Sequence, residues 1–308
     1  MSSIINIKSK KKLSELLFIS YPNEFKYLEE LYKNRPEECF ISFFQDGREL
    51  FKLKPNTKKI HKRLYKLMLK ETLPSYIKSG RKKHSYLTNA FEHKEANNFF
   101  FVDIKSFYPS ITFEKIKRNL IINYNQSFDV ATFISNLLTV KQHKSNGQRA
   151  LVTGSPLSQS FSFLINKPMF DKLNNLANEN KIKMSVYVDD ISFSTKATIP
   201  FEFIRSVHAI LKSYDYDLSK GKGKYYRGGE GKNAEVTGVK ITKYGFFITD
   251  KRKRKIKKKI KLLNLQTGDI HLFNSLLSSV LQAKLVNIKY EKYERLLQKY
   301  INPSRQIQ

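Results

Sequence analysis

Residues 184–195, MSVYVDDISFST, place two adjacent carboxylates, Asp189 and Asp190, between two runs of alternating apolar and β-branched residues. Alternation with a period of two predicts a β-strand on each side, with the acidic pair at the turn of a tight hairpin. Two neighbouring carboxylates repel each other unless a divalent cation neutralises them. The stretch therefore predicts a sheet that carries concentrated negative charge at one exposed end.

A third acid belongs to a second predicted strand, NFFFVDI (residues 98–104), which has Asp103 near its end. Mg²⁺ typically takes one or two carboxylates together with water and substrate phosphates, so acids from neighbouring strands can complete a site for two ions. The alternative is that the paired aspartates merely form a turn. That turn has no Gly or Asn, and a second acid-bearing strand precedes it, which favours the metal site.

The charge balance points to a polyphosphate partner. Lys and Arg number 57 against 27 Asp and Glu, for a formal net charge of +30. Such a charge predicts binding to nucleic acid, with an anionic membrane surface or a merely basic soluble protein as alternatives. Aromatic residues make up 13% of the chain, and their interleaving with lysine suits stacking on bases. The single cysteine, Cys39, excludes an intramolecular disulfide and a cysteine-based zinc site.

The order of predicted elements is strand, helix, hairpin, helix, strand. This order is typical of a split βαβ layout, in which helices cover one face of an antiparallel sheet and the hairpin lies in mid-sheet. A polar segment, KQHKSNGQRA, is predicted to be an exposed loop. The predicted helices are 58–71, the segment after Thr112, 130–138, 155–177 and 202–213, and the last strand pair is 235–242 and 245–249.

The C-terminal part begins with KRKRKIKKKI (residues 251–260), in which eight of ten residues are basic. Apolar positions between Leu272 and Leu281 then predict one or two helices of a small helical subdomain. No stretch approaches about 18 uninterrupted apolar residues, and the N-terminal segment lacks the apolar centre of a signal peptide. We therefore expect a soluble, cytoplasmic protein without a membrane partner.

Five segments, in this order along the chain, resemble motifs of reverse transcriptases, and two of them mark the retron type. YxDD alone is a weak signal, whereas the ordered set is specific and extends the resemblance over most of the chain. The segments are Asn89–His93 (NAxxH), Phe101–Ser110 (motif A), Gly154–Ser158 (motif B), Tyr187–Asp190 (motif C) and Val236–Gly238 (VTG).

The resemblance implies an α+β fold with right-hand polymerase architecture, made of fingers, a split-βαβ palm and a helical thumb. By this resemblance, residues 1–98 form the N-terminal and fingers region. Residues 99–250 form the palm, with a finger-side insertion at about 112–150, and residues 251–308 form the helical thumb.

The resemblance also implies roles for the acids. Asp103 and Asp189 would hold two Mg²⁺ ions, one activating the primer hydroxyl and one holding the incoming triphosphate. Asp190 would be a weaker ligand, and the carbonyl of Ile104 a backbone ligand. Tyr108 falls where related polymerases place the ring that crowds the sugar 2′ position, which would favour dNTPs; core packing is the alternative.

Further site residues follow from the same motifs. Gly154 would approach a base pair or nucleotide closely, with a helix-start glycine as the alternative, and Ser155 and Pro156 complete the substrate-binding loop. The basic loop 219–233 would bring Lys224 to the leaving pyrophosphate, with Lys222 close behind. A solvated linker is the alternative for this loop.

Nucleic-acid contacts are predicted at both motif and tail residues. Asn89 and His93 would order a loop or contact RNA, with a structural hydrogen-bonded pair as the alternative. The tract that begins with Lys251, Arg252 and Arg254 would meet backbone phosphates, unless it is only a solvated helix face. Unpaired bases would stack on aromatic residues of the tail, which could equally be thumb core. These are Tyr290, Tyr293 and Tyr300.

The resemblance implies an RNA-directed DNA polymerase of retron type, a nucleotidyltransferase that copies part of a structured noncoding RNA into RNA-linked DNA for antiphage defence. Its partners would be that RNA template-primer, the DNA product and dNTPs, while a toxic effector protein and an oligomeric state are left open. Two alternatives remain. One is another bacterial defence or intron-type reverse transcriptase, and the other is a non-catalytic RNA-binding palm module.

Overall fold

A four-stranded antiparallel sheet carries both acid-bearing segments. Strand β3 (Asn98–Asp103) pairs with β7 (Asp190–Thr195) on one side and with β8 (Lys224–Tyr226) on the other, and β6 (Lys183–Tyr187) lies outside β7. The predicted hairpin, β6–β7, is therefore confirmed, as is its pairing with the strand that ends in Asp103. Its predicted mid-sheet position holds for β7 only, because β6 forms an edge of this sheet.

The computed structural model describes most of the 308-residue chain. The described residues are 4–45, 47–68, 73–80, 84–145, 147–155, 157–219, 224–226, 234–265 and 269–301. Two predicted site residues, Pro156 and the secondary candidate Lys222, lie outside them.

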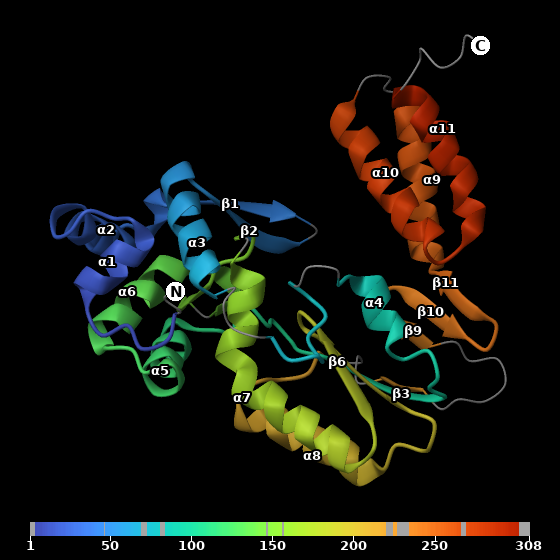
Figure 1. Cartoon of the computed structure of the whole chain (residues 1–308), viewed down its shortest axis with the longest axis horizontal. Coiled ribbons are helices and arrows are strands. Elements are labelled where there is room, and N and C mark those ends of the chain that lie inside the picture. The colour runs from blue at the N-terminus through green and yellow to red at the C-terminus, as the bar shows by residue number, and fades with distance from the viewer. Residues whose placement is uncertain are drawn as a thin grey trace.

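One face of the sheet is buried beneath two helices. Figure 1 shows α7 (Ser158–Glu179) and α8 (Phe201–Ser213) on the same side of this sheet. The ring of Phe100 stacks on that of Phe193 at 5.9 Å between centroids, and Phe193 meets Phe203 of α8 edge-on at 5.2 Å. Each fully buried aromatic side chain contributes about 1.5–3 kcal/mol through removal of its surface from water. The predicted α+β fold is confirmed, but helices are not confined to one face, because α4 (Tyr86–Phe91) packs on the opposite face beside Phe99.

The N-terminal helices share a hydrophobic core with the two helices that follow β3 in the chain. The rings of Phe25 in α2 and Phe133 in α6 stack at 4.4 Å between centroids. Helix α3 begins at Pro55, three residues before the predicted start. The elements of this part are α1 (Lys10–Leu17), α2 (Asn23–Asn34), η1 (Pro36–Glu38), β1 (Phe40–Gln45), β2 (Arg48–Leu53), α3 (Pro55–Met68), α5 (Phe113–Tyr124) and α6 (Phe128–Leu138).

The segment 235–242 was predicted as one strand, and this is wrong. Thr237 (φ +46°) and Gly238 (φ +80°) both adopt positive φ, as the two central residues of a type I′ hairpin turn do. The turn separates β9 (Ala234–Val236) from β10 (Val239–Thr242), and β11 (Gly245–Ile248) completes a second, three-stranded sheet. This sheet packs on α4 (Tyr86–Phe91) through a small apolar cluster of its own.

The C-terminal residues form a three-helix bundle with a separate apolar core. Its helices are α9 (Asp250–Leu265), α10 (Ile270–Lys284) and α11 (Glu291–Ile301), with η3 (Ile288–Tyr290) before the last. Figure 1 shows the bundle standing beyond β9–β11, away from α1 and α2. The predicted apolar positions between 272 and 281 all lie on the single helix α10. Tyr290 and Tyr293 pack against the bundle core, which favours the core alternative predicted for them.

None of the helices in the described part of the chain is long and apolar enough to span a bilayer.

Candidate active site

The three predicted acids meet at one end of the four-stranded sheet. Asp103, the last residue of β3, stands directly opposite Asp190, the first residue of β7, and Asp190 stands opposite Tyr187 of β6. Side chains of directly opposed residues share a face, with Cβ atoms about 4.5–5.5 Å apart. Because Val102 and Ile191 face α7 and α8, this row faces away from those helices.

Asp189 occupies the hairpin turn beside this row. Its backbone carbonyl accepts a hydrogen bond from the Ile104 N–H at 3.4 Å, which ties the turn to the end of β3. The chain after Asp103 is held from the other side, where the Ser219 N–H donates to the Asp103 carbonyl at 3.0 Å. The sheet therefore fixes the backbone of all three acids relative to one another.

The turn itself is strained at Val188. Its φ of +62° lies in the left-handed region, where a β-branched residue is rarely found. Hairpin turns with positive φ at their first central residue ordinarily use glycine there. The Val188 N–H donates to the Ser79 hydroxyl at 3.0 Å, so a neighbouring segment holds the strained turn in place. Strain of this kind persists only where the surrounding structure enforces it.

Tyr108 lies between the core and the acids. It is half-buried, its ring meets that of Phe107, and its hydroxyl is hydrogen-bonded to Ser162 of α7. Burial, together with the negative charge of Asp189, raises the pKa of Tyr108 to about 12, while the Ser162 hydrogen bond lowers it. The phenol is therefore neutral at physiological pH and lies within electrostatic reach of the catalytic-site candidate Asp189.

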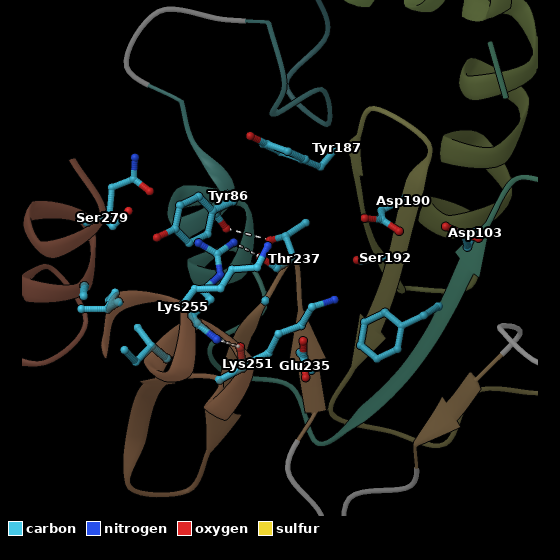
Figure 2. A pocket seen from close by; sticks show the side chains of 18 of the residues that line it. Tyr86, Asp103, Tyr187, Asp190, Ser192, Glu235, Thr237, Lys251, Lys255 and Ser279 are labelled. Carbon is cyan, nitrogen blue, oxygen red and sulfur yellow. Dashed lines mark hydrogen bonds between the residues drawn. The ribbon is translucent and has the colours of Figure 1, made fainter. Parts of the chain in front are cut away.

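Two of the acids, Asp103 and Asp190, line a cavity of about 800 Å³ whose opposite wall is basic. Figure 2 shows Asp103 and Asp190 on one side of this cavity and Lys251 and Lys255 of α9 on the other. Lys259 also lines it, and spacing by four residues places these lysines on one helix face. A polyanion between the two walls would meet the lysines on one side, while cations bridge it to the acids on the other.

The described residues contain no group of three or more His, Cys, Asp or Glu side chains arranged to hold a metal ion by themselves. An ion at the acidic row would need further ligands from water and substrate phosphates. Mg²⁺ is bound in this way in phosphoryl-transfer sites. The donor set, hard carboxylate oxygens at the edge of an open cavity, fits such an ion.

Gly154 of the motif B loop packs against backbone. A Cβ at this position would lie 2.4 Å from the Phe51 carbonyl oxygen of β2, and its φ is +80°. The close approach predicted there is thus made to a neighbouring strand, not to a helix start, since α7 begins only at Ser158. Whether a nucleotide also passes this glycine stays a prediction.

Ser155 is held by a buried histidine that the sequence patterns did not single out. His61 Nδ1 lies 2.8 Å from the Ser155 hydroxyl, and His61 Nε2 lies 3.0 Å from the Leu137 carbonyl. Since a carbonyl can only accept, Nε2 carries the proton and the serine hydroxyl donates to Nδ1. Complete burial lowers the pKa of His61 to about 4. The signal available was the position of His61 beside Ile60, on the apolar side of its helix.

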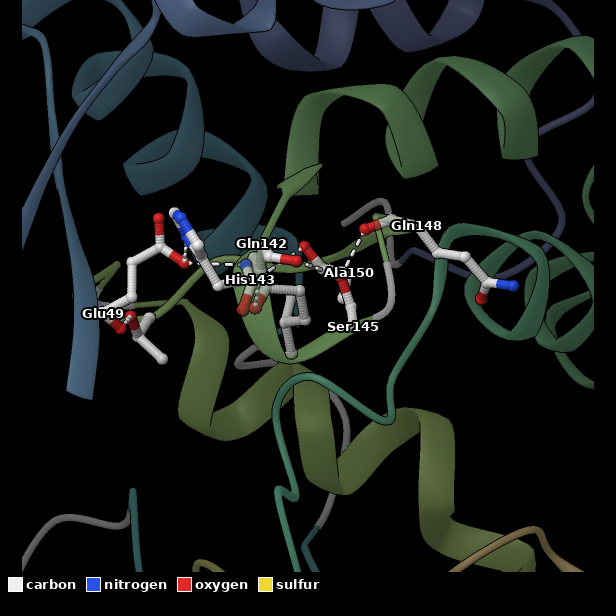
Figure 3. Close-up of polar contacts among 8 residues, drawn as sticks. Glu49, Gln142, His143, Ser145, Gln148 and Ala150 are labelled. Carbon is white, nitrogen blue, oxygen red and sulfur yellow. Dashed lines mark hydrogen bonds and ion pairs between the residues drawn. The ribbon is translucent and has the colours of Figure 1, made fainter. Parts of the chain in front are cut away.

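The segment before this loop is largely exposed, as predicted, but short strands at its two ends make it a hairpin. Strands β4 (Thr139–Lys141) and β5 (Arg149–Leu151) flank η2 (His143–Ser145), and the Gln142 side chain donates to the carbonyls of Ala150 and Leu151 at 2.9 and 2.8 Å. Figure 3 shows that Glu49 of β2 reaches this hairpin, where it accepts from the His143 N–H at 3.0 Å. Gln142 and Ser145 are buried within it because their side chains donate to backbone carbonyls of the hairpin.

Asn89 and His93 are buried, which favours a structural role over the predicted contact with RNA. His93 is 1% exposed and joins two strands, with Nδ1 2.6 Å from the Ser194 hydroxyl and Nε2 2.7 Å from the Ser185 hydroxyl. Asn89 is fully buried and its amide donates to the Thr237 hydroxyl at 3.4 Å. The two residues bond to these partners and not to each other.

The predicted basic contacts divide into two groups. Lys251 and Arg254 are exposed on α9, whereas Arg252 is half-buried and donates to the Thr237 carbonyl at 3.0 Å. Arg252 is therefore bound to protein, although it also lines the cavity, and its contact with a phosphate stays a prediction. Lys224 lies on β8 opposite Phe101, so its backbone is part of the sheet and not of the predicted mobile loop. Its side chain lies outside the described atoms.

The family model for reverse transcriptase (RNA-dependent DNA polymerase) matches residues 46–266, which include all three acids and the cavity's principal walls. The chain belongs to this family. The matched stretch is continuous, covers most of the sequence and contains all five motif segments.

Curated relatives of this reverse transcriptase-family chain include retron reverse transcriptases. Retron Ec86 reverse transcriptase of Escherichia coli is 25% identical over 206 residues, 66% of this chain and 57% of that protein. Retron Mx65 reverse transcriptase of Myxococcus xanthus is 25% identical over 169 residues (51% and 39%), and retron Mx162 reverse transcriptase of the same organism 31% over 128 residues (38% and 26%). The predicted resemblance to the retron type is confirmed, while the matched segments span from about a quarter to somewhat over half of these relatives.

Among solved structures, a telomerase from Candida albicans in complex with a TWJ fragment of telomeric RNA is similar with a TM-score of 0.39 and 15% identity. The match covers 67% of this chain and 42% of that one. A likeness this distant adds nothing to the family assignment.

Gly154→Ala is expected to destabilise the protein by about 3 kcal/mol, since it adds a clash with the Phe51 carbonyl to the cost of a positive φ. Gly147→Ala is the matched control, because Gly147 has a φ of +75° but open space around a Cβ. That variant should lose only about 1 kcal/mol. Urea unfolding of both variants measures the difference, and equal losses would contradict the clash.

The two buried histidines predict a loss of stability in mild acid. Burial lowers the pKa of His61 and of His93 to about 4, from the ordinary 6.5. Between these values the unfolded chain binds protons that the folded chain does not, so the free energy of unfolding falls as the pH falls, by up to about 3 kcal/mol for each residue. Urea unfolding at a series of pH values measures this slope. His61→Gln removes one titrating group and should reduce the slope, and an unchanged slope would refute the assignment.

Proposed function

We propose that this protein is an RNA-directed DNA polymerase of retron type, which copies part of a structured noncoding RNA into RNA-linked DNA by nucleotidyl transfer. The single observation that carries the proposal is the row formed by Asp103 and Asp190, opposite each other on β3 and β7, with Asp189 beside them. Membership of the reverse transcriptase family and the retron relatives support it. In this proposal residues 1–98 act as fingers, 99–250 as palm, with a finger-side insertion at about 112–150, and 251–308 as thumb.

The acids bind the cations of the reaction. Asp103 and Asp189 hold two Mg²⁺ ions, Asp190 is a weaker ligand, and the Ile104 carbonyl is a backbone ligand. When bound, the ions supply Lewis-acid activation of the primer hydroxyl and neutralise the charge that develops on the triphosphate. The strained turn at Val188 and the bond from the Ile104 N–H hold Asp189 in place before substrate arrives, so little reorganisation is needed.

The other residues select and hold substrate. Tyr108 presents its ring beside Asp189, where it excludes a 2′-hydroxyl and so favours dNTPs. Gly154, Ser155 and Pro156 border the nucleotide, with Ser155 kept in position by His61. Lys224 protonates the leaving pyrophosphate.

The template-primer lies in the cavity between the acids and α9. Lys251 and Arg254 contact its phosphates, which positions the duplex without reading its sequence. Priming from an RNA 2′-hydroxyl would give a branched RNA–DNA product with a role in antiphage defence, and a toxic effector is a further candidate partner. A different defence-associated reverse transcriptase and a non-catalytic RNA-binding palm are the competing functions.

Asp189→Asn tests the proposed chemistry, because it keeps the size of the side chain but removes the charge that binds cations. Loss of one such ligand removes several kcal/mol of transition-state stabilisation, so primer extension should slow by about 10³-fold. The assay supplies an RNA template-primer, dNTPs and Mg²⁺ at saturating concentrations. Equal extension by both proteins would remove Asp189 from the site. Sequencing of nucleic acid that co-purifies with the wild type identifies the RNA to use, and no extension on that RNA would favour the binding module.

Tyr108→Ala should relax the discrimination between dNTPs and NTPs, because it removes the ring that crowds the 2′ position. A lost steric exclusion of this kind is expected to be worth about 1–3 kcal/mol, or roughly 10- to 100-fold in the ratio of kcat/KM values. Tyr108→Phe is the control, since it keeps the ring and loses only the hydroxyl bonded to Ser162. If the Phe variant relaxed selectivity as much as the Ala variant, the ring would not be the selective element.

A further inference from the structure

The two segments that mark the retron type, 89–93 and 236–238, contact each other directly. The Asn89 amide donates to the Thr237 hydroxyl at 3.4 Å, and that hydroxyl donates to the Tyr86 carbonyl at 2.8 Å. Ala90 and Val236 are buried together in the same apolar cluster. At the other end of α4, His93 bonds to Ser185 and Ser194 of the four-stranded sheet. The two motifs therefore form one unit that is fixed to the sheet carrying the acids.

Arg252 of α9 is docked on this unit. Its guanidinium lies over the Tyr86 ring, 3.6 Å from the centroid, and donates to the Thr237 carbonyl at 3.0 Å. A Cβ at Gly238 would lie 2.6 Å from Arg252 Nε, so the glycine of the 236–238 motif leaves the space that the guanidinium occupies. Tyr86, Thr237 and Gly238 thus provide a stacking surface, an acceptor and a space for one arginine.

The remaining contacts across this junction are apolar or exposed. The cluster beneath α4 and the core of the three-helix bundle are separate, but Ile248 of β11 is buried in the bundle core and Val286 packs against both clusters. Apolar contacts of this kind attract without a preferred direction. Asp250 pairs with Lys240 at 2.8 Å, but the aspartate is exposed, and such pairs contribute little. A half-buried guanidinium that stacks and donates has a defined geometry. Among the described residues, Arg252 is therefore a half-buried directional contact between the bundle and the unit of α4 and the three-stranded sheet, which His93 in turn fixes to the sheet that holds the acids.

We propose that Arg252 is a positioning residue, which sets the orientation of the three-helix bundle so that Lys251 and Lys255 face the acids across the cavity. The inference rests on the proposed polymerase function for its catalytic consequence, but not for its structural one. It assigns the segments 89–93 and 236–238 to the orientation of the bundle. It also assigns Arg252 a contact inside the protein, in addition to the phosphate contact predicted for it.

Two variants separate the positioning role from a phosphate contact. Arg252→Ala removes the charge and the geometry, whereas Arg252→Lys keeps the charge but cannot reproduce the planar stacking and the bond to Thr237. Both should raise the KM for an RNA template-primer about tenfold and shorten the products, with the KM for dNTP unchanged. A charge-only role predicts that the lysine variant behaves like the wild type.

A distance measurement tests the same proposal without activity. Spin labels on cysteines introduced at exposed Glu202 of α8 and Lys258 of α9 report the separation of the bundle from the sheet layer, and Cys39, 2% exposed, is not accessible to the label. Double electron–electron resonance should give one narrow distance distribution for the labelled protein with Arg252 intact and a broad distribution for both Arg252 variants. Arg254→Ala is the matched control, because it removes the same charge from the same helix. It should keep the narrow distance, while RNA binding becomes weaker and less dependent on salt, as expected for the loss of one phosphate contact.

Gly238→Ala is an independent test of the same contact. It should broaden the distance in the wild-type background, and much less of its effect should remain in the Arg252→Ala background, because the clash it creates is with that guanidinium. Narrow distances in both Arg252 variants, with unchanged KM for template-primer, would overturn the proposal. An inactive wild type would refute the polymerase function, whereas the distance data would still decide the role of Arg252.

Discussion

The antiparallel pairing of β3 with β7 is the interaction on which the site depends. It sets Asp103 opposite Asp190, and a slip of one residue would turn one of the two acids toward α7 and α8. That slip would also expose Phe100 or Phe193, whose stacked rings lie in the buried layer. The hydrophobic face thus fixes the register, and the register places the charges.

Apolar burial cannot by itself keep an acidic turn in a strained conformation. The Val188 turn is held by the Ser79 hydroxyl and by the bond between the Ile104 N–H and the Asp189 carbonyl, each of which has a direction and a length. Hydrogen bonds within the protein contribute about 1 kcal/mol each, which is comparable to the cost of a single left-handed residue. A few such bonds are enough to fix where the carboxylates lie.

Much of this arrangement could be predicted from the sequence, because periodicity reports which side of an element is buried. The period-two pattern around Asp189 predicted the hairpin, and the apolar run before Asp103 predicted its partner strand. Contacts between distant segments could not be predicted in this way. The sequence around His93 does not indicate that two serines of the β6–β7 hairpin bind its ring. The sequence around Gly154 likewise does not indicate that the Phe51 carbonyl lies beside it. The break at Thr237 could have been found, because the alternation of apolar residues changes phase between Val236 and Val239 and a glycine lies between them.

Three polar side chains join the separate parts of the molecule around the acids. His61 connects α3 to the motif B loop, His93 connects α4 to the hairpin that bears Asp189, and Arg252 connects the bundle to the turn at Thr237. Apolar surfaces can slide over one another at little cost, since their attraction scales with area and not with direction. A fully paired polar contact has one satisfied arrangement, and a misplaced one leaves buried groups without partners. The net charge of +30 attracts a long polyanion such as the proposed substrate, but it does not orient it. In the proposed function the polar contacts supply that orientation, because they hold the basic helix α9 opposite the acids.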